Sequence, residues 1–269
     1  MSAHYKSHIF IVGAMKAGTT TLFEMLSEHP KICSSKNKEP GFFCNTLRDN
    51  SCETEYSNLF DYSDCAHEYC LDASTCYTKY PDEIDVPKRM YEYGIRPKII
   101  FSVRNPLRRI ESQFNFEKNK DWGPDYLLDA RLLHYSMYFL QMHQYFKYFD
   151  DMDDYFIVDF QDLIDRQNTV SKRIFDWLGL DNIDTEYVNK NKTKPISIFE
   201  STAQKFPFEM SKILPKSISK IAKNVLRTYT PQVKSSLSED QSQKVKKWIR
   251  RDIERFGSTF GFPIGNWGF

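Results

Sequence analysis

A short apolar run that ends in a glycine-rich turn is the feature that most constrains the fold of this chain. His8–Val12 is rich in β-branched and aromatic residues, as a buried parallel strand is, and Gly13 follows it directly. Large apolar residues then recur at helical spacing over Thr20–Glu28, and Pro30 ends this helix because the residue before a proline avoids the α conformation. Strand, glycine loop and helix in this order predict the first unit of a nucleotide-binding α/β fold.

Further strands and helices alternate along the chain. Pro97–Val103 and Tyr155–Val158 have the composition of strands, and Asn105 and Pro106 suit the N-cap and first position of the helix after the former. The other predicted elements are a long helix over Leu127–Phe149, a helix over Val170–Leu178 capped by Gly179, a last helix near Gln241–Phe256, and loops with short helices over Phe42–Ser74. The alternation predicts an α/β fold, with a single domain over residues 1–269 and a central parallel sheet flanked by helices.

The overall charge and the apolar segments exclude several classes of protein. The formal net charge is +1, whereas a general nucleic-acid binder needs clustered cations to displace the counterions of the phosphates. No segment approaches the roughly 20 apolar residues that span a bilayer. The run Ile9–Val12 is also too short for the apolar region of a signal peptide. We therefore expect no nucleic-acid partner, no membrane span and a cytoplasmic location.

The cysteines are confined to the N-terminal part of the chain. They are Cys33, Cys44, Cys52, Cys65, Cys70 and Cys76, and their spacings match no zinc-binding pattern. Because reducing compartments keep thiols free, we expect reduced cysteines. We also find no set of residues that predicts a metal site.

The glycine loop has the composition of a phosphate-binding turn with an unusual lysine position. It lies between strand and helix, where backbone N–H groups and the helix N-terminus face an anion. Gly13 and Gly18 have the spacing of the G-x-x-x-x-G-K-[ST] loop of nucleoside triphosphatases, but Thr19 stands where that loop has its lysine. The lysine lies inside the turn, as Lys16. Hydrolysis of ATP or GTP is therefore not expected, whereas Lys16 can neutralise a terminal anionic group such as a sulfate.

A second polar segment follows the strand Pro97–Val103. Arg104 leaves the carboxyl end of this strand, where open α/β sheets bind ligands, and its guanidinium can form paired hydrogen bonds with a phosphate. Ser112 lies about two helical turns further on, so its hydroxyl can reach the same anion. An arginine and a hydroxyl in this arrangement suit a nucleotide with an extra phosphate on its ribose.

With these two segments in this order, the chain resembles the nucleotide-dependent sulfotransferases, whose nucleotide-binding core is similar to that of P-loop kinases. Residues 13–22 (GAMKAGTTTL) resemble the family's loop for the 5′-phosphosulfate of 3′-phosphoadenosine 5′-phosphosulfate (PAPS). Residues 103–114 (VRNPLRRIESQF) resemble its 3′-phosphate-binding strand-turn-helix. The resemblance implies that the phosphosulfate is held by Lys16, Ala17, Gly18, Thr19, Thr20 and Thr21, and the 3′-phosphate by Arg104 and Ser112.

Other segments resemble the heparan-sulfate-type branch of the family. Residues 38–43 (KEPGFF) are similar to its K-E-x-x-F-F segment, and residues 71–77 (LDASTCY) to its E-x-[ST]-P-x-Y segment, with Thr75 in place of the proline. Residues 191–195 resemble the loop that closes over the nucleotide, which implies a contact from Lys194. This branch uses a glutamate base, and the K-x-H segment of the phenol and steroid enzymes is absent here. The resemblance therefore implies Glu39 and Lys16 as the catalytic residues.

The implied activity is transfer of a sulfuryl group from PAPS to a hydroxyl or amine of a small-molecule or carbohydrate acceptor, without a metal. Glu39 would act as general base, provided that burial raises its pKa toward neutrality. Two alternatives stay open. One is a P-loop kinase-like phosphotransferase, which the displaced lysine disfavours, and the other is a non-catalytic nucleotide-binding relative. The acceptor and the oligomeric state stay open as well.

Overall fold

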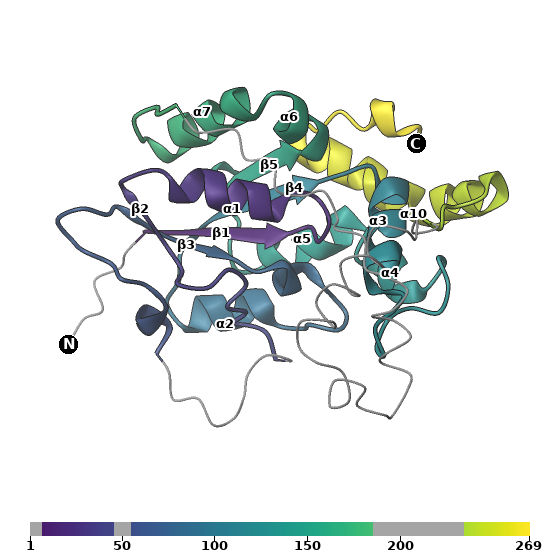
Figure 1. Ribbon diagram of the computed structural model, residues 1–269, viewed down its shortest axis with the longest axis horizontal. Helices are drawn as coiled ribbons and strands as arrows, with labels where there is room; N and C mark the ends of the chain where they lie inside the picture. Colours follow the sequence, from purple (N-terminus) through teal and green to yellow (C-terminus); the bar gives the residue numbers. More distant parts are fainter. Residues whose placement is uncertain (1–6, 46–54, 185–233) are drawn as a thin grey trace, which may run out of the picture.

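The computed structural model describes residues 7–45, 55–184 and 234–269, and a parallel sheet forms the centre of this part of the chain (Figure 1). Its strands are β1 (Ser7–Gly13), β2 (Ile32–Ser34), β3 (Tyr69–Ala73), β4 (Pro97–Val103) and β5 (Tyr155–Asp159). The strand order is β2-β3-β1-β4-β5, and all neighbouring pairs are parallel. The predicted α/β fold with a central parallel sheet is confirmed, whereas the extent of the domain over residues 1–269 stays a prediction.

Alternation along β1 divides the core between the two faces of the sheet. Ile9 and Ile11 pack in one hydrophobic cluster, and Phe10 and Val12 in the other, because successive side chains of a strand point to opposite faces. All four side chains have no exposed surface. The strand is thus buried on both sides, which is why its sequence is apolar throughout rather than alternating.

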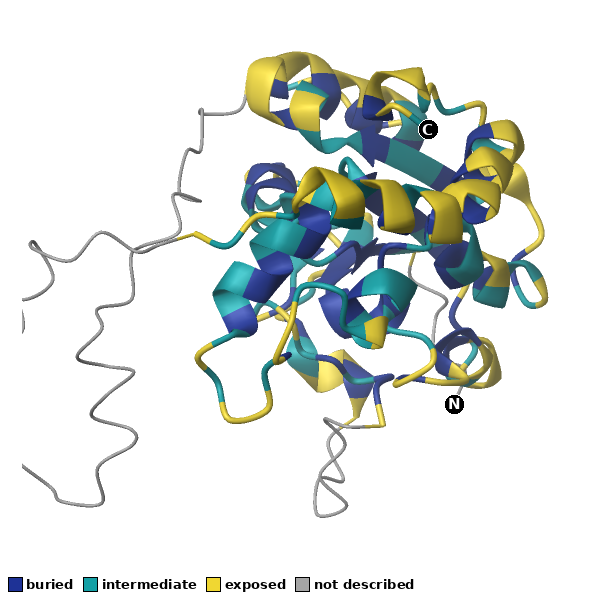
Figure 2. Ribbon diagram, turned by 90° about the vertical axis from the view of Figure 1, so that its right-hand side faces the viewer, coloured by how far each residue is buried: buried dark blue, intermediate teal, exposed yellow. Residues whose placement is uncertain are grey.

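Helices cover both faces (Figures 1 and 2). The cluster that contains Ile9 and Ile11 receives residues from α1 (Thr19–Ser27), α6 (Phe160–Asp165) and α7 (Gln167–Leu178). The other cluster receives residues from α2 (Val86–Glu92), α3 (Pro106–Glu117), α4 (Ala130–His134), α5 (Tyr138–Phe146) and α10 (Glu239–Phe260). Short 3-10 helices lie at Tyr56–Leu59, Thr75–Thr78, Met152–Asp154 and Gly265–Trp267. In Figure 2 the outward sides of the helices are exposed and the sides toward the sheet are buried.

Two strands were missed by the sequence prediction. β2 has only three residues, and β3 lies at the end of the segment that was predicted to form loops and short helices. β3 was hidden because it carries Asp72, a charged residue in an apolar run, with no exposed surface. Only the three-dimensional structure supplies the hydroxyl groups that satisfy this carboxylate.

The predicted long helix over Leu127–Phe149 is wrong, because two shorter helices, α4 and α5, replace it. In a continuous helix the carbonyl of Leu132 would accept the N–H of Ser136. Here that carbonyl accepts hydrogen bonds from the Arg109 guanidinium (2.9 Å) and the Ser136 hydroxyl (2.7 Å), and the N–H of Ser136 donates to Leu133 instead. Contacts from α3 therefore break the helix at a point that its own sequence does not mark.

The new helix start at α5 is capped by a distant carboxylate. Asp252 of α10 accepts the N–H groups of Phe139 (3.0 Å) and Leu140 (2.8 Å). Burial raises the pKa of Asp252 from 3.8 to about 6, against the lowering effect of these two N–H donors. The carboxylate is thus buried at an energetic cost and satisfies two N–H groups that α5 leaves without partners.

Asp252→Asn should flatten the pH dependence of stability. Since the folded state raises the pKa of this acid, its stabilising contribution is complete below about pH 3.8 and is lost as the pH rises through about 6. The loss corresponds to about 3 kcal/mol, and Asp72, whose pKa is also raised to about 6, adds to it in the same range. Denaturant unfolding at a series of pH values measures this slope. The exposed Asp240→Asn serves as control, and an unchanged slope in Asp252→Asn would contradict the prediction.

Candidate active site

The loop after β1 is attached to β4 through Ser102. The N–H of Ala14 donates to the Ser102 carbonyl (2.7 Å), and the Ser102 hydroxyl donates to the carbonyl of Ala17 (2.6 Å). Ser102 is fully buried, so both bonds are shielded from water. The two bonds fix the start and the middle of the loop on the neighbouring strand.

The first turn of α1 is open to an anion. Gly18 is the N-cap in the left-handed conformation (φ 85°), and no side chain caps the helix. The first N–H groups of a helix lack intrahelical partners and lie at the positive end of its dipole. Thr19 and Thr21 are buried while Thr20 is half-buried, so Thr20 has the more accessible hydroxyl. An uncapped helix start is one feature that the phosphate site predicted for Gly13–Thr21 needs, and the site itself stays a prediction.

Both glycines of the loop are required by close neighbours. A Cβ on Gly13 would lie 2.1 Å from Thr78 Oγ1, which donates to the Val12 carbonyl (2.8 Å). A Cβ on Gly18 would lie 2.8 Å from a methyl group of Leu163 on α6, at a backbone conformation that already favours glycine. The glycines therefore let the loop pass close to the 3-10 helix at Thr75–Thr78 and to α6.

Lys16 projects from the loop toward α3. Its ammonium group lies 4.2 Å from the centre of the Phe116 ring, and its backbone is left-handed (φ 69°). Burial lowers the pKa of Lys16, and the nearby charge of Arg104 acts in the same direction, while Glu117 opposes both. Among the described residues Lys16 forms no ion pair with a carboxylate.

Arg104 meets the same loop from the end of β4. Its Nη1 donates to the Lys16 carbonyl (3.2 Å), and its guanidinium lies 4.6 Å from the centre of the Phe160 ring. Burial lowers the pKa of Arg104, and within the described ranges no carboxylate pairs with it. Two half-buried cations side by side without a carboxylate partner are electrostatically suited to a multiply charged anion.

Ser112 is placed by helical periodicity rather than by a direct contact with the loop. It lies on α3, three residues after Arg109 and four before Phe116, which both contact the loop. Residues at these spacings share a face of a helix, so Ser112 faces the same side. The predicted N-cap of α3 is confirmed: Asn105 Oδ1 accepts the N–H groups of Leu107 (3.0 Å) and Arg108 (3.4 Å).

A buried arginine behind the loop was missed by sequence reasoning. Arg109 has no exposed surface and donates to the carbonyl of Met15 (3.3 Å), to Gln113 Oε1 (2.7 Å) and to the Ser136 hydroxyl (2.9 Å). Gln113 in turn donates to the buried Glu117 (3.0 Å). The sequence did contain a signal for this network. Arg109, Gln113 and Glu117 recur every four residues and lie next to the buried Ile110 and Phe114 on α3. Arg109 ties the loop to α3 and to the break between α4 and α5.

Glu39 lies at the same edge of the sheet as the loop. Its N–H donates to the carbonyl of Ala73 (3.0 Å), the last residue of β3, and Ala73 is paired with Ile11 of β1. Because parallel strands end at one edge, the ends of β3, β1 and β4 bring Glu39, Lys16 and Arg104 to one side of the molecule. Among the described residues no hydrogen bond joins Glu39 directly to either cation.

The carboxylate of Glu39 has two close partners. Oε1 accepts from Lys38 Nζ (2.7 Å) and Oε2 from the Thr75 hydroxyl (2.9 Å). Burial favours a higher pKa, but the Lys38 charge and these two hydrogen bonds outweigh it, so the pKa of Glu39 is lowered overall. The side chain is 41% exposed. The condition set above, a pKa raised toward neutrality, is thus contradicted in the absence of bound substrate.

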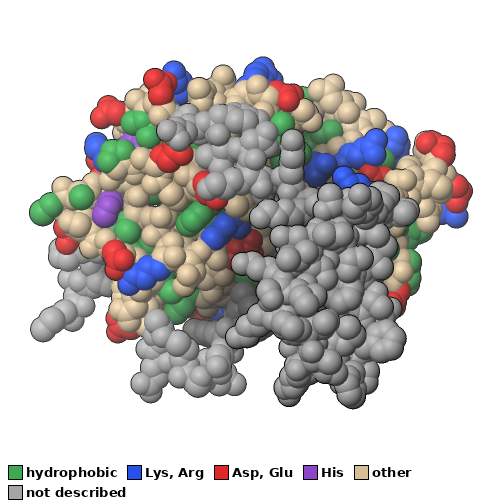
Figure 3. Space-filling model, in the orientation of Figure 1, with side chains coloured by type: hydrophobic (Ala, Val, Ile, Leu, Met, Phe, Trp, Pro, Cys, Tyr) green, Lys and Arg blue, Asp and Glu red, His purple; other side chains and the backbone are tan. Residues whose placement is uncertain are grey.

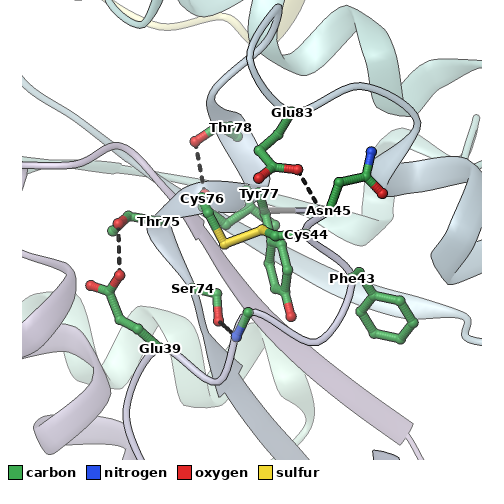
Figure 4. The surroundings of a disulfide bond; sticks show 12 residues. Glu39, Phe43, Cys44, Asn45, Ser74, Thr75, Cys76, Tyr77, Thr78 and Glu83 are labelled. Atoms are coloured by element: carbon green, nitrogen blue, oxygen red, sulfur yellow. Dashed lines mark hydrogen bonds between the residues drawn. A yellow bond between two sulfur atoms is a disulfide. The ribbon is translucent and has the colours of Figure 1, made fainter. Parts of the chain in front are cut away.

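A disulfide joins the segment of Glu39 to the segment of Thr75 (Figure 4). It connects Cys44 with Cys76, and both residues are buried. The expectation of reduced cysteines is therefore wrong for this pair, whereas Cys65 is a free thiol. Spacing gave no hint of the pairing, because the two cysteines are 32 residues apart in the sequence.

Basic side chains gather near α3 and α10 in the view of Figure 3. The sequence of α10 contains Lys244, Lys246, Lys247, Arg250, Arg251 and Arg255. Lys194, implied in nucleotide binding, lies outside the described residues. In the described ranges no helix could cross a bilayer, and no group of three or more His, Cys, Asp and Glu side chains could hold a metal. A metal-free reaction stays a prediction.

Comparisons with known proteins bear on the family and the fold of this chain. A family model described as Sulfotransferase domain matches residues 6–257. The membrane-associated sulfotransferase kil1 of Dictyostelium discoideum is 27% identical over 109 residues, which cover 40% of this chain but only 22% of that protein. The crystal structure of a sulfotransferase from Alicyclobacillus acidocaldarius has a TM-score of 0.67 at 18% identity, with 100% of both chains covered. At this identity the likeness shows the fold alone.

Proposed function

Because the chain belongs to the sulfotransferase family, we propose that it transfers a sulfuryl group from PAPS to a hydroxyl or amine of a small-molecule or carbohydrate acceptor. The observation that carries the proposal is the pairing of an uncapped helix start at Gly18 with two half-buried cations, Lys16 and Arg104, that lack carboxylate partners among the described residues. Such a site fits the phosphosulfate and 3′-phosphate groups of this donor.

Each residue has a distinct task in the proposed reaction. The bound donor supplies the sulfuryl group, whose sulfur forms a bond to the acceptor atom as its bond to the phosphate oxygen breaks. Glu39 takes the proton that the acceptor loses. Lys16 and the N–H groups at the start of α1 stabilise the negative charge on the leaving oxygen. Arg104 and Ser112 hold the 3′-phosphate, and the site otherwise orients the reactants.

The donor site can be tested without knowledge of the acceptor. We would titrate the protein calorimetrically with adenosine 3′,5′-bisphosphate, with ATP and 5′-AMP as controls. Micromolar binding of the bisphosphate and much weaker binding of the controls would support the proposal. Equal or tighter binding of ATP would contradict it and favour a phosphotransferase. Bisphosphate binding without transfer to any acceptor would favour a non-catalytic relative.

Arg104→Ala should abolish the preference for a 3′-phosphorylated nucleotide. Loss of a charge-assisted contact to phosphate costs about 2 kcal/mol, so the affinity for adenosine 3′,5′-bisphosphate should fall roughly 30-fold and that for 5′-AMP much less. The same calorimetric titration measures both. Arg108→Ala is the matched control, because Arg108 is exposed and pairs with Glu111 (3.0 Å). Unchanged selectivity in Arg104→Ala would remove this residue from the 3′-phosphate site.

The cytoplasmic location stays part of the proposal, and one feature counts against it. Reducing compartments keep most thiols free, whereas Cys44 and Cys76 are joined in the structure. Both cysteines are at most 7% exposed, so the bond is shielded from reductants in solution. Lys194 likewise stays a predicted nucleotide contact.

A further inference from the structure

A fully buried carboxylate lies behind Glu39 and has no task in the proposed reaction. Asp72, next to the last residue of β3, has no exposed surface. Its Oδ1 accepts from the Ser74 hydroxyl (2.8 Å), and its Oδ2 accepts from the hydroxyls of Tyr77 (2.8 Å) and Tyr56 (3.2 Å). A buried carboxylate with this many donors is well satisfied as an ion. Its pKa is raised by burial to about 6, so it is ionised at neutral pH and can only accept hydrogen bonds.

The hydroxyl of Ser74 transmits the state of Asp72 to the turn that carries Glu39. A serine hydroxyl has one hydrogen to donate, and Asp72 takes it. The oxygen of Ser74 is therefore left to accept, and it accepts the N–H of Gly41 (2.9 Å). Figure 4 shows this bond beside the bond from Thr75 to Glu39. A protonated or amide group at position 72 could donate to Ser74 and reverse its hydroxyl.

The turn needs such an anchor because its backbone is unfavourable. Glu39 has a left-handed conformation (φ 61°), as does Gly41 (φ 59°). Residues with a Cβ rarely adopt this conformation, and they keep it only where the surrounding contacts hold them. The bonds from Glu39 N–H to Ala73 and from Gly41 N–H to Ser74 hold the turn on both sides.

We propose that Asp72 is a positioning residue for Glu39: it orients the Ser74 hydroxyl, which holds Gly41 and thereby keeps the Glu39 carboxylate at the Thr75 hydroxyl. The catalytic meaning of this inference rests on the proposed function, in which Glu39 is the base. The geometric part, that Asp72 and Ser74 set the environment of Glu39, can be tested independently.

Ser74→Ala removes the link and leaves Asp72 in place. The carboxyl carbons of the glutamates can be followed by NMR during a pH titration of protein labelled with carbon-13 glutamate, and the signal missing in Glu39→Gln belongs to Glu39. If the link holds the turn, Ser74→Ala weakens the bond from Thr75, and the pKa of Glu39 rises. Ser171→Ala is the matched control, because Ser171 is also fully buried but lies on α7.

Asp72→Asn provides a second variant of equal size. We expect the turnover of PAPS, with water as the acceptor, to fall roughly 10-fold or more, since a misplacement of about 1 Å can cost on the order of 10²-fold. The affinity for adenosine 3′,5′-bisphosphate should not change, because the hydrogen bonds of Asp72 go to Ser74, Tyr77 and Tyr56 and not to Lys16 or Arg104. If Asp72→Asn does not fold, the titration of Glu39 in Ser74→Ala still tests the positioning role.

The outcomes separate this inference from the proposed function. An unchanged titration of Glu39 in a folded Ser74→Ala protein overturns the positioning role, and so does wild-type turnover in folded Asp72→Asn. A wild-type protein that fails to bind adenosine 3′,5′-bisphosphate overturns the donor site but leaves the titration result valid. A raised pKa of Glu39 in Ser74→Ala, with no change in Ser171→Ala, supports the inference whether or not the wild-type protein binds the bisphosphate.

Discussion

Glu39→Gln should lower kcat by about 10²- to 10⁴-fold while leaving the affinity for adenosine 3′,5′-bisphosphate unchanged. General bases contribute a factor of this size. Glutamine has the shape of glutamate, and its amide oxygen can still accept from Thr75, so the turn is preserved. What is lost is the ability to take a proton from the acceptor. Steady-state kinetics with the acceptor found by screening measures the loss, and calorimetry measures the affinity.

The control for this variant is Glu92→Gln, an exposed residue on α2 that pairs with Lys88 (3.8 Å). It removes an exposed carboxylate that has no role in the proposed reaction and should keep the wild-type kcat. A near wild-type rate in Glu39→Gln would exclude Glu39 as the base. The pH profile adds a second check. Because Lys38 and Thr75 hold the pKa of Glu39 below its ordinary 4.5, the rate should fall only when the pH drops below that value.

Lys16→Ala should lower kcat by about 10²- to 10³-fold, which is the usual cost of removing one group that stabilises developing charge. The charge on the leaving oxygen is greater in the transition state than in the bound donor, so kcat should suffer more than the affinity for adenosine 3′,5′-bisphosphate. Steady-state kinetics measures the loss in kcat, and calorimetry measures the loss in affinity for the bisphosphate, so that the two losses can be compared.

Lys88→Ala is the matched control, since Lys88 is exposed on α2 and pairs with Glu92 (3.8 Å). An effect of Lys16→Ala on KM alone would show that Lys16 binds ground state and transition state equally. Such a result would leave the helix start at Gly18 as the main source of charge stabilisation.

Lys16→Ala and Glu39→Gln change residues that lie at the same edge of the sheet but are positioned by different strands. Lys16 and Arg104 are joined by a hydrogen bond of 3.2 Å through the loop backbone, whereas Glu39 is held by β3 and the 3-10 helix after it. The two cations are therefore positioned by β1 and β4, whereas Glu39 is positioned by β3. This separation is why a change at Glu39 should spare nucleotide affinity.

The secondary structure around Lys16 and Arg104 could be predicted, because short stretches of sequence determine it. Local sequence was enough to predict the strand before Gly13, the N-cap at Asn105 and the glycine turn before the first helix. The structure contains all three features. The roles given to these residues by resemblance stay predictions. The family follows from the match over residues 6–257.

Other features were decided only by contacts between distant residues. The helix break at Ser136 depends on Arg109, and β3 tolerates Asp72 because Tyr56 and Tyr77 supply hydroxyls. The disulfide joins two cysteines that are 32 residues apart in the sequence. The condition that burial raises the pKa of Glu39 is not met, because the charge of the adjacent Lys38 and the hydrogen bonds from Lys38 and from the distant Thr75 outweigh burial. A sequence shows the tendency of each segment to form a helix or a strand. The hydrogen-bond partners of buried polar groups often lie far away in the sequence and are known only from the folded structure. Those partners decide where helices break and how carboxylates ionise.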